Sequence, residues 1–320
     1  MTYKIKTVDG EFIRRASGFR NWVTKDGEPG PSGIGGFKAE PGRYHLYVSY
    51  ACPWANRTLI FRALKGLEDV ISVSVVHPLL ESKGWEFAEY PGATLDGVNH
   101  FRYLYQAYAA SDAYFNSAVT VPVLWDKQQN IIVNNESSEI IRMLNSAFDE
   151  FAQSKADYYP AELRDEIDAI NEVVYENVNN GVYRAGFASS QQAYDAAYDR
   201  LFATLDELDQ RLASQRYLVG DQMTEADWRL FTTLVRFDAV YYNHFKTNKK
   251  RLVEYPNLWA YTRELYQVPG VAETVNMDHI KYHYFASHRS INPTGIVPKG
   301  PDIDFWLPHG RGEVKGESNV

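Results

Sequence analysis

The sequence predicts an α/β domain at residues 43–150, followed by an all-helical domain at residues 151–285. Two observations carry this prediction. Strand-like and helix-like patterns alternate in the first half of the chain, whereas only helical periodicity is present beyond about Pro160. Turn-forming glycine and proline residues dominate the two ends, which predicts an extended arm at residues 1–42 and a C-terminal tail at residues 286–320.

The elements of the α/β domain follow from local residue patterns. Residues 43–50 are rich in β-forming side chains, and residues 55–67 carry apolar side chains at helical spacing. The nearly continuous apolar run at residues 70–76 predicts a buried parallel strand, which completes a βαβ unit. A hairpin is predicted at residues 120–133 and a helix at residues 137–148. This order of elements is typical of a thioredoxin-like fold.

The second domain contains four segments with helical periodicity, at residues 161–180, 191–214, 225–245 and 256–268. Thr224 and Asp227 have the spacing of a capping box, and they predict the start of the third of these helices. Between the two strand-rich parts of the first domain, residues 77–120 show only weak periodicity. Long loops inside a domain usually serve function.

The composition excludes several classes of partner. The chain has 33 basic and 41 acidic residues and a formal net charge of −8, so we expect no nucleic-acid partner. No basic and apolar leader is visible, and no apolar run approaches the roughly 18 residues of a membrane span. We therefore expect a cytoplasmic protein without a membrane partner. A single cysteine excludes an intramolecular disulfide and a multi-cysteine metal site.

That cysteine, Cys52, stands between the first predicted strand and helix, directly before Pro53. A lone cysteine is either a small buried hydrophobic residue or a reactive thiol. The N-terminus of a helix favours the thiolate, which is the attacking species, and proline suits the first helical position. We therefore expect a nucleophile with a lowered pKa. Ala55 stands where a dithiol oxidoreductase carries its second cysteine, so an external thiol such as glutathione has to resolve a mixed disulfide.

Two further residue pairs fit a glutathione site. A proline at the entrance of a strand, as in Val121-Pro122, is unusual in a regular ladder. In thioredoxin-like folds such a proline is cis and lies beside the active thiol, and the residue before it pairs with the glutathione backbone. Glu136 and Ser137 begin a predicted helix, whose N–H groups can hold a carboxylate. Taken alone, this second pair would be an ordinary helix cap.

With these motifs in order, the chain resembles the Xi class of glutathione transferases, the glutathionyl-hydroquinone reductases. The motifs that carry the resemblance are Tyr50–Ala55, Gly84–Phe87, Thr120–Trp125, Asn135–Ser137, Leu234–Tyr241, His244–Lys246 and Asn292–Gly295. The resemblance extends from about residue 10 to the tail. It implies a glutathione transferase architecture and a homodimer.

The resemblance also implies a reaction. The Cys52 thiolate attacks the sulfur of a glutathionyl-hydroquinone, and the hydroquinone leaves with a proton delivered to its ring carbon. A second glutathione then attacks the mixed disulfide at Cys52 and leaves as oxidised glutathione. Glutathione is therefore the co-substrate, and no metal is implied.

The same resemblance implies roles for individual residues. The implied glutathione contacts are Trp85, Val121, Glu136 and Ser137. The implied quinol pocket consists of Tyr183, Tyr241 and Tyr284, because phenols can hydrogen-bond a quinol oxygen and stack on its ring. Tyr242 is an alternative to Tyr241 as a member of this pocket. Adjacent residues of a helix do not share a face, so only one of the two can point into it. Thr247 stands where most members carry a cysteine, so this position is not catalytic.

Two alternative functions compete with this interpretation. An omega-like glutathione transferase with thiol transferase or dehydroascorbate reductase activity would share Cys52. It would not be expected to carry Trp85 in the long loop at residues 77–120, the three tyrosines or the long tail. A non-catalytic scaffold would not be expected to keep Cys52 together with its partners.

A metal site at three histidines of the C-terminal region is a third alternative. His279 and His283 are four residues apart and share one helix face, with His288 close in sequence. However, Ile280 stands where a zinc protease carries its catalytic glutamate. We expect structural or surface histidines and no metal.

Overall fold

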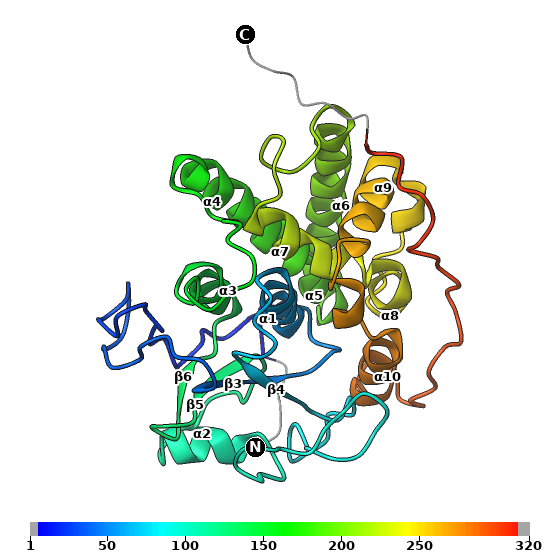
Figure 1. The fold of residues 1–320 in the computed structure, drawn as a ribbon. Coiled ribbons are helices and arrows are strands. Elements are labelled where there is room, and N and C mark those ends of the chain that lie inside the picture. The colour runs from blue at the N-terminus through cyan, green and yellow to red at the C-terminus, as the bar shows by residue number, and fades with distance from the viewer. Residues whose placement is uncertain (1–5, 313–320) are drawn as a thin grey trace. The chain divides into compact units, whose positions relative to one another are not determined.

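The computed structural model describes residues 6–312, so residues 1–5 of the predicted arm and residues 313–320 of the predicted tail lie outside the described residues. The described chain divides into two compact units (Figure 1). The first consists of Arg15–Asp157 and Glu273–Arg289, and the second of residues 6–14, Tyr158–Ala272 and residues 290–312.

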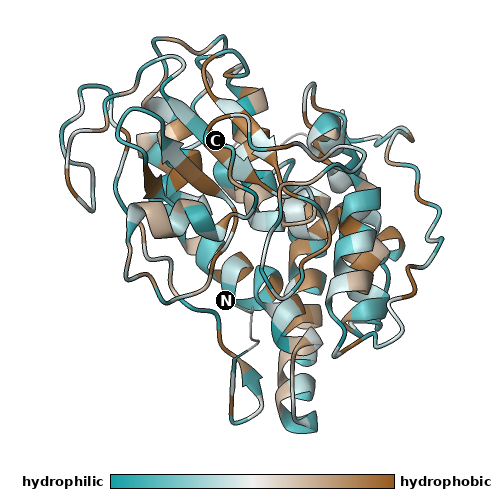
Figure 2. Ribbon diagram, turned by 90° about the horizontal axis from the view of Figure 1, so that it is seen from below, coloured by the Kyte–Doolittle hydropathy of each residue, from teal (hydrophilic) through white to brown (hydrophobic). Residues whose placement is uncertain are grey.

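The first unit is built around a mixed four-stranded sheet with the order β4-β3-β5-β6. The strands are β3 (Tyr44–Val48), β4 (Ser72–Val75), β5 (Val123–Asp126) and β6 (Ile131–Asn134). β3 pairs parallel with β4 and antiparallel with β5, which pairs antiparallel with β6. All residues of β3 are buried, and Figure 2 shows strands of this sheet at the brown, hydrophobic end of the scale. The predicted parallel strand pair and hairpin are confirmed.

Helices cover both faces of this sheet. α1 (Pro53–Leu64) and α3 (Ser137–Ser146) pack together on one face, and α2 (Tyr105–Ser111) lies on the other (Figure 1). α1 ends where Gly66 adopts a φ of +61°, a left-handed conformation that glycine tolerates best. This layering sets the N-termini of α1 and α3 at the ends of β3 and β6.

α2 is absent from the elements that the sequence predicts, because the stretch 77–120 shows little periodicity. The helix has seven residues, and only Ala107 and Tyr108 are buried. Two turns with so few buried side chains do not produce a recognisable helical period.

The predicted arm is divided between the two units. Residues 15–42 belong to the first unit, where the Asn21 amide donates to Val133 and the Asn135 amide donates to Phe19, at 3.0 and 3.1 Å. This segment therefore follows the free edge of β6. Residues 6–14 belong to the second unit and contain a short hairpin of β1 (Thr7–Val8) and β2 (Glu11–Phe12).

The second unit is helical, as the sequence predicts, but two of its predicted helices are interrupted. Its helices are α4 (Arg164–Val173), α5 (Gly181–Gly186), α6 (Gln191–Ser214), α7 (Glu225–Leu234), α8 (Tyr242–His244) and α9 (Pro256–Tyr266). π-helical turns at Val174–Asn179 and Phe237–Tyr241 precede α5 and α8. The predicted capping box is present, and the Asp227 carboxylate accepts the Thr224 amide at 2.7 Å.

The tail has neither helix nor strand between residues 290 and 312 but is fastened to the second unit. Arg311 is 3% exposed, and its guanidinium donates to the Glu264 carboxylate at 2.9 Å and to the Arg216 carbonyl at 2.6 Å. The ring of Phe305 stacks on that of Tyr266, with centroids 4.9 Å apart. The last helix, α10 (Met277–Ser287), belongs to the first unit, although the helical domain predicted at residues 151–285 includes most of it.

Candidate active site

Cys52 is the N-cap residue of α1, at the junction with β3, as the sequence predicts. Pro53 occupies the first turn of the helix, where a missing backbone N–H costs nothing. The thiol is half-buried, and its Sγ donates to the Val121 carbonyl oxygen at 3.5 Å. The structure thus brings Cys52 and Val121 together. The peptide bond between Val121 and Pro122 is cis, which confirms the predicted geometry.

Glu136 is the N-cap residue of α3, and Ser137 is the first residue of the helix. The Glu136 carboxylate accepts the Ser138 amide at 3.2 Å and the Ser17 hydroxyl at 3.0 Å. Burial opposes ionisation of Glu136, but the hydrogen bonds from Ser138 and Ser17 and the charge of Arg57 outweigh it and hold its pKa below the usual value. This position therefore carries a partly buried negative charge at neutral pH.

Arg57 is a charged residue of this region that sequence reasoning did not single out. It lies on α1, one turn beyond Cys52, and is only 1% exposed. Its guanidinium lies over the Trp54 ring, 4.4 Å from the centroid. The signal that could have identified it is its position, one turn into a largely apolar helix that begins at a cysteine. Charged residues are rarely buried without a partner, so an arginine at such a position is a candidate for the site.

Trp85 lies in the loop between β4 and α2, which we call the Trp85 loop (residues 76–104). The indole is 6% exposed and stacks on the imidazole of His283 in α10, with ring centroids 5.0 Å apart and planes inclined by 24°. The Trp85 carbonyl accepts the Leu104 amide at 2.9 Å. All the glutathione contacts that the sequence predicts thus belong to the first unit.

Two of the three predicted quinol-binding tyrosines lie together in the second unit. The rings of Tyr183 and Tyr241 meet edge to face, with centroids 6.0 Å apart. Tyr241 also stacks on Phe245 at 5.5 Å, and the Arg14 guanidinium lies 4.9 Å from the centroid of Tyr183. Tyr241 is fully buried in this cluster, whereas its neighbour Tyr242 is half-buried.

Tyr284, the third predicted tyrosine, belongs to α10 in the first unit. It is 1% exposed, and its ring meets the rings of His283 and His288 edge to face, at 5.4 and 5.3 Å. Within a unit, then, the structure brings Tyr183 and Tyr241 together but not Tyr284.

The histidines of α10 contact backbone carbonyls. His279 Nε2 donates to the Pro91 carbonyl at 2.7 Å, and His283 Nδ1 donates to the Pro78 carbonyl at 2.9 Å. Burial lowers the pKa of both, that of His283 to about 4, so both rings are neutral at pH 7. Within residues 6–312, no group of three or more histidine, cysteine, aspartate or glutamate side chains is arranged to hold a metal ion.

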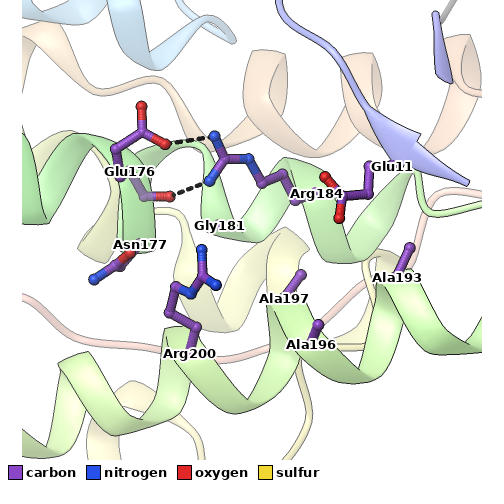
Figure 3. Close-up of a pocket in the computed structure, with 9 residues that line it drawn as sticks. All are labelled: Glu11, Glu176, Asn177, Gly181, Arg184, Ala193, Ala196, Ala197 and Arg200. Atoms are coloured by element: carbon purple, nitrogen blue, oxygen red, sulfur yellow. Dashed lines mark hydrogen bonds and ion pairs between the residues drawn. The ribbon is translucent and has the colours of Figure 1, made fainter. Parts of the chain in front are cut away.

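A surface pocket lies in the second unit between α5, α6 and β2 (Figure 3). The ion pair between Arg184 and Glu176, at 2.5 Å, forms one of its walls, and Arg200 projects from α6 on the facing side. None of the residues that the sequence predicts for the active site lines this pocket. Among the described helices, none is both long and apolar enough to cross a bilayer.

Comparison with known proteins identifies the family. Residues 51–147 match the model of the N-terminal domain of glutathione S-transferases, and residues 191–264 match that of the C-terminal domain. The chain is 57% identical over 310 residues to glutathionyl-hydroquinone reductase YqjG of Escherichia coli, and the alignment covers 97% of this chain and 94% of the relative. It is 52% identical over 299 residues to glutathionyl-hydroquinone reductase PcpF of Sphingobium chlorophenolicum, with 93% and 92% covered.

Solved structures agree with these relatives. Glutathione-bound YqjG from Escherichia coli K-12 has a TM-score of 0.90 at 58% identity, with 92% of this chain and 96% of that chain covered. The Xi-class enzyme of Phanerochaete chrysosporium has a TM-score of 0.90 at 51% identity, with 96% and 98% covered. The thioredoxin-like and all-helical architecture that the sequence predicts is confirmed. The chain therefore belongs to the glutathione S-transferase family of enzymes and, within it, to the Xi class.

Proposed function

We propose that this protein reduces glutathionyl-hydroquinones to hydroquinones with glutathione as reductant. The observation that carries the proposal is a single thiol, Cys52, at the N-terminus of α1 and in contact with the carbonyl of a cis peptide, in a chain of the Xi class. A site with one thiol and no resolving cysteine suits a reaction that ends by exchange with free glutathione.

The reaction takes place in two displacements at sulfur. The Cys52 thiolate attacks the glutathione sulfur of the thioether, the bond from sulfur to the ring carbon breaks, and that carbon receives a proton. The ring is thereby reduced, while Cys52 and glutathione are oxidised to a mixed disulfide. A second glutathione thiolate attacks this disulfide and leaves as oxidised glutathione, which returns Cys52 to the thiolate.

The glutathione half-site consists of Trp85, Val121, Glu136 and Ser137. The ionised Glu136 carboxylate suits the ammonium group of the γ-glutamyl residue, because its pKa is held low. The N-terminus of α3, which begins at Ser137, suits the neighbouring carboxylate. The backbone at Val121 pairs with the peptide, and the Trp85 indole contacts it.

The quinol half-site contains Tyr183 and Tyr241, and Tyr284 is proposed as its third member. The Tyr183 phenol is suited to donate a hydrogen bond to a quinol oxygen. The guanidinium of Arg14 over its ring favours any negative charge that develops at this oxygen. We further propose that the enzyme is a cytoplasmic homodimer.

An omega-like activity is the second candidate, because the chain is also 46% identical over 301 residues to a protein of Schizosaccharomyces pombe named glutathione S-transferase omega-like 2. The purified protein should be assayed with a glutathionyl-hydroquinone and, separately, with dehydroascorbate, at the same glutathione concentration. We expect hydroquinone and oxidised glutathione in equal amounts, with a kcat/KM at least about 100-fold above that for dehydroascorbate. A higher kcat/KM for dehydroascorbate would favour the omega-like activity.

A further inference from the structure

α10 is the last helix of the chain, yet it packs against the Trp85 loop within the first unit. We propose that His283 of α10 is a positioning residue, whose ring holds the Trp85 indole in the orientation that binds glutathione. This inference rests on the proposed function, which assigns Trp85 to the glutathione half-site. It adds to that function a residue from the far end of the sequence.

The stack between the two rings is tightly constrained. Trp85 and His283 are both at least nine-tenths buried, with ring centroids 5.0 Å apart and nearly parallel planes. A carbonyl oxygen only accepts hydrogen bonds, so the His283 Nδ1 that contacts Pro78 carries the proton. This bond fixes both the tautomer and the plane of the imidazole. The imidazole in turn provides a flat neutral surface for the indole.

The backbone next to Trp85 does not set the orientation of the indole by itself. Gly84 has a φ of +85°, and no atom lies within 4 Å of the position that its Cβ would occupy. The path of the backbone is fixed on both sides of the indole, because the Gly84 amide donates to the Glu81 carbonyl and the Trp85 carbonyl accepts the Leu104 amide, both at 2.9 Å. Backbone hydrogen bonds do not set the side-chain torsions of Trp85, so the stack on His283 supplies the restraint on the plane of the indole.

α10 holds the Trp85 loop on both sides of the indole. Before Trp85, the Ser287 hydroxyl accepts the Leu80 amide at 2.9 Å. After it, the Tyr90 hydroxyl donates to Asp278 at 2.6 Å, and the His279 ring donates to the Pro91 carbonyl. With both flanks of the loop fixed to one helix, the ring of His283 meets Trp85 in a defined register.

The test separates the ring of His283 from its hydrogen bond. His283→Asn keeps an N–H donor but removes the ring, whereas His283→Phe keeps a ring but removes the donor. S-methylglutathione cannot form a disulfide, so calorimetric titration with it measures binding alone. We expect His283→Asn to raise its Kd about tenfold, and His283→Phe to stay within about threefold of the unmodified protein. kcat at saturating glutathione should change less than about threefold in both variants.

Two further variants complete the design. His100→Asn makes the same change at an exposed histidine of the same loop, and its Kd should equal that of the unmodified protein. In a Trp85→Ala background, His283→Asn should have no further effect on Kd, because a residue that acts through Trp85 loses its effect when the indole is gone. If His283→Asn does not fold, as judged by thermal unfolding, His283→Gln provides the same comparison.

The outcomes distinguish failure of this inference from failure of the proposed function. If the unmodified protein does not bind S-methylglutathione, the glutathione site itself is wrong. If it binds but the folded Asn or Gln variant binds equally well, His283 does not position Trp85. An equal loss of binding in the presence and absence of the Trp85 indole would also overturn the inference.

Discussion

Cys52→Ala is expected to abolish reduction of glutathionyl-hydroquinones, with kcat/KM falling on the order of 10⁴-fold or more. Cys52 is the only cysteine among the 320 residues, so no second thiol can take over the attack on the glutathione sulfur. The measurement is the rate at which hydroquinone is released from a purified substrate at a fixed excess of glutathione, with the hydroquinone quantified by chromatography.

Two control measurements show whether this variant still folds and still binds glutathione. The Cys52 side chain is small and half-buried, so removal of its sulfur should change the unfolding temperature little. S-methylglutathione should bind with a Kd within about threefold of the unmodified protein. Substantial turnover by a variant that meets both conditions would refute nucleophilic catalysis by Cys52.

Tyr183→Phe and Tyr241→Phe are expected to slow reduction of glutathionyl-hydroquinones about 10- to 100-fold, the effect of losing a hydrogen bond to a quinol oxygen in a buried site. Both changes keep the aromatic rings that pack with Phe245 and remove only the hydroxyl groups. Reduction of a small mixed disulfide of glutathione does not involve a quinol, so its rate should change less than about threefold.

Tyr242→Phe is the matched control for these variants, because Tyr242 adjoins Tyr241 in sequence but is half-buried and begins α8. We expect it to keep both activities. If all three variants lose both activities equally, the tyrosines act in folding and not in recognition of the quinol. If only Tyr242→Phe impairs quinol reduction, the assignment of Tyr241 is wrong.

Much of the first unit could be predicted because its signals are local. The β-rich run before Cys52, the helical spacing after it and Pro53 at the first turn lie within one short segment, and the structure places β3 and α1 there. The same holds for the hairpin of β5 and β6 and for Glu136 at the start of α3. These patterns need no knowledge of distant residues.

The features that could not be predicted depend on contacts between distant segments. The spacing of His279 and His283 indicates a common helix face, but their partners, the carbonyls of Pro91 and Pro78, lie 188 and 205 residues earlier in the chain. Backbone carbonyls leave no sequence signal, so the same spacing also suggested a metal site. The contact of the Ser17 hydroxyl with Glu136 could not be predicted either, because it joins residues 119 positions apart and Ser17 lies in an arm without periodicity.

The interruptions of the helical unit show a second limit. The predicted helix at residues 225–245 forms as α7, a π-helical turn and α8. Within that turn, the Asp238 carboxylate accepts the Leu252 and Val253 amides, at 2.5 and 3.2 Å. Hydrophobic periodicity detects the whole segment but not the hydrogen bonds that fasten its turn.

The most direct test of the role of Cys52 is intact-protein mass spectrometry after the protein is mixed with an equimolar glutathionyl-hydroquinone in the absence of free glutathione. We expect one glutathionyl group on the protein, located at Cys52 by peptide mapping, together with an equal amount of released hydroquinone. Free glutathione added afterwards should remove the adduct as oxidised glutathione. Release of hydroquinone without an adduct at Cys52 would contradict the mechanism.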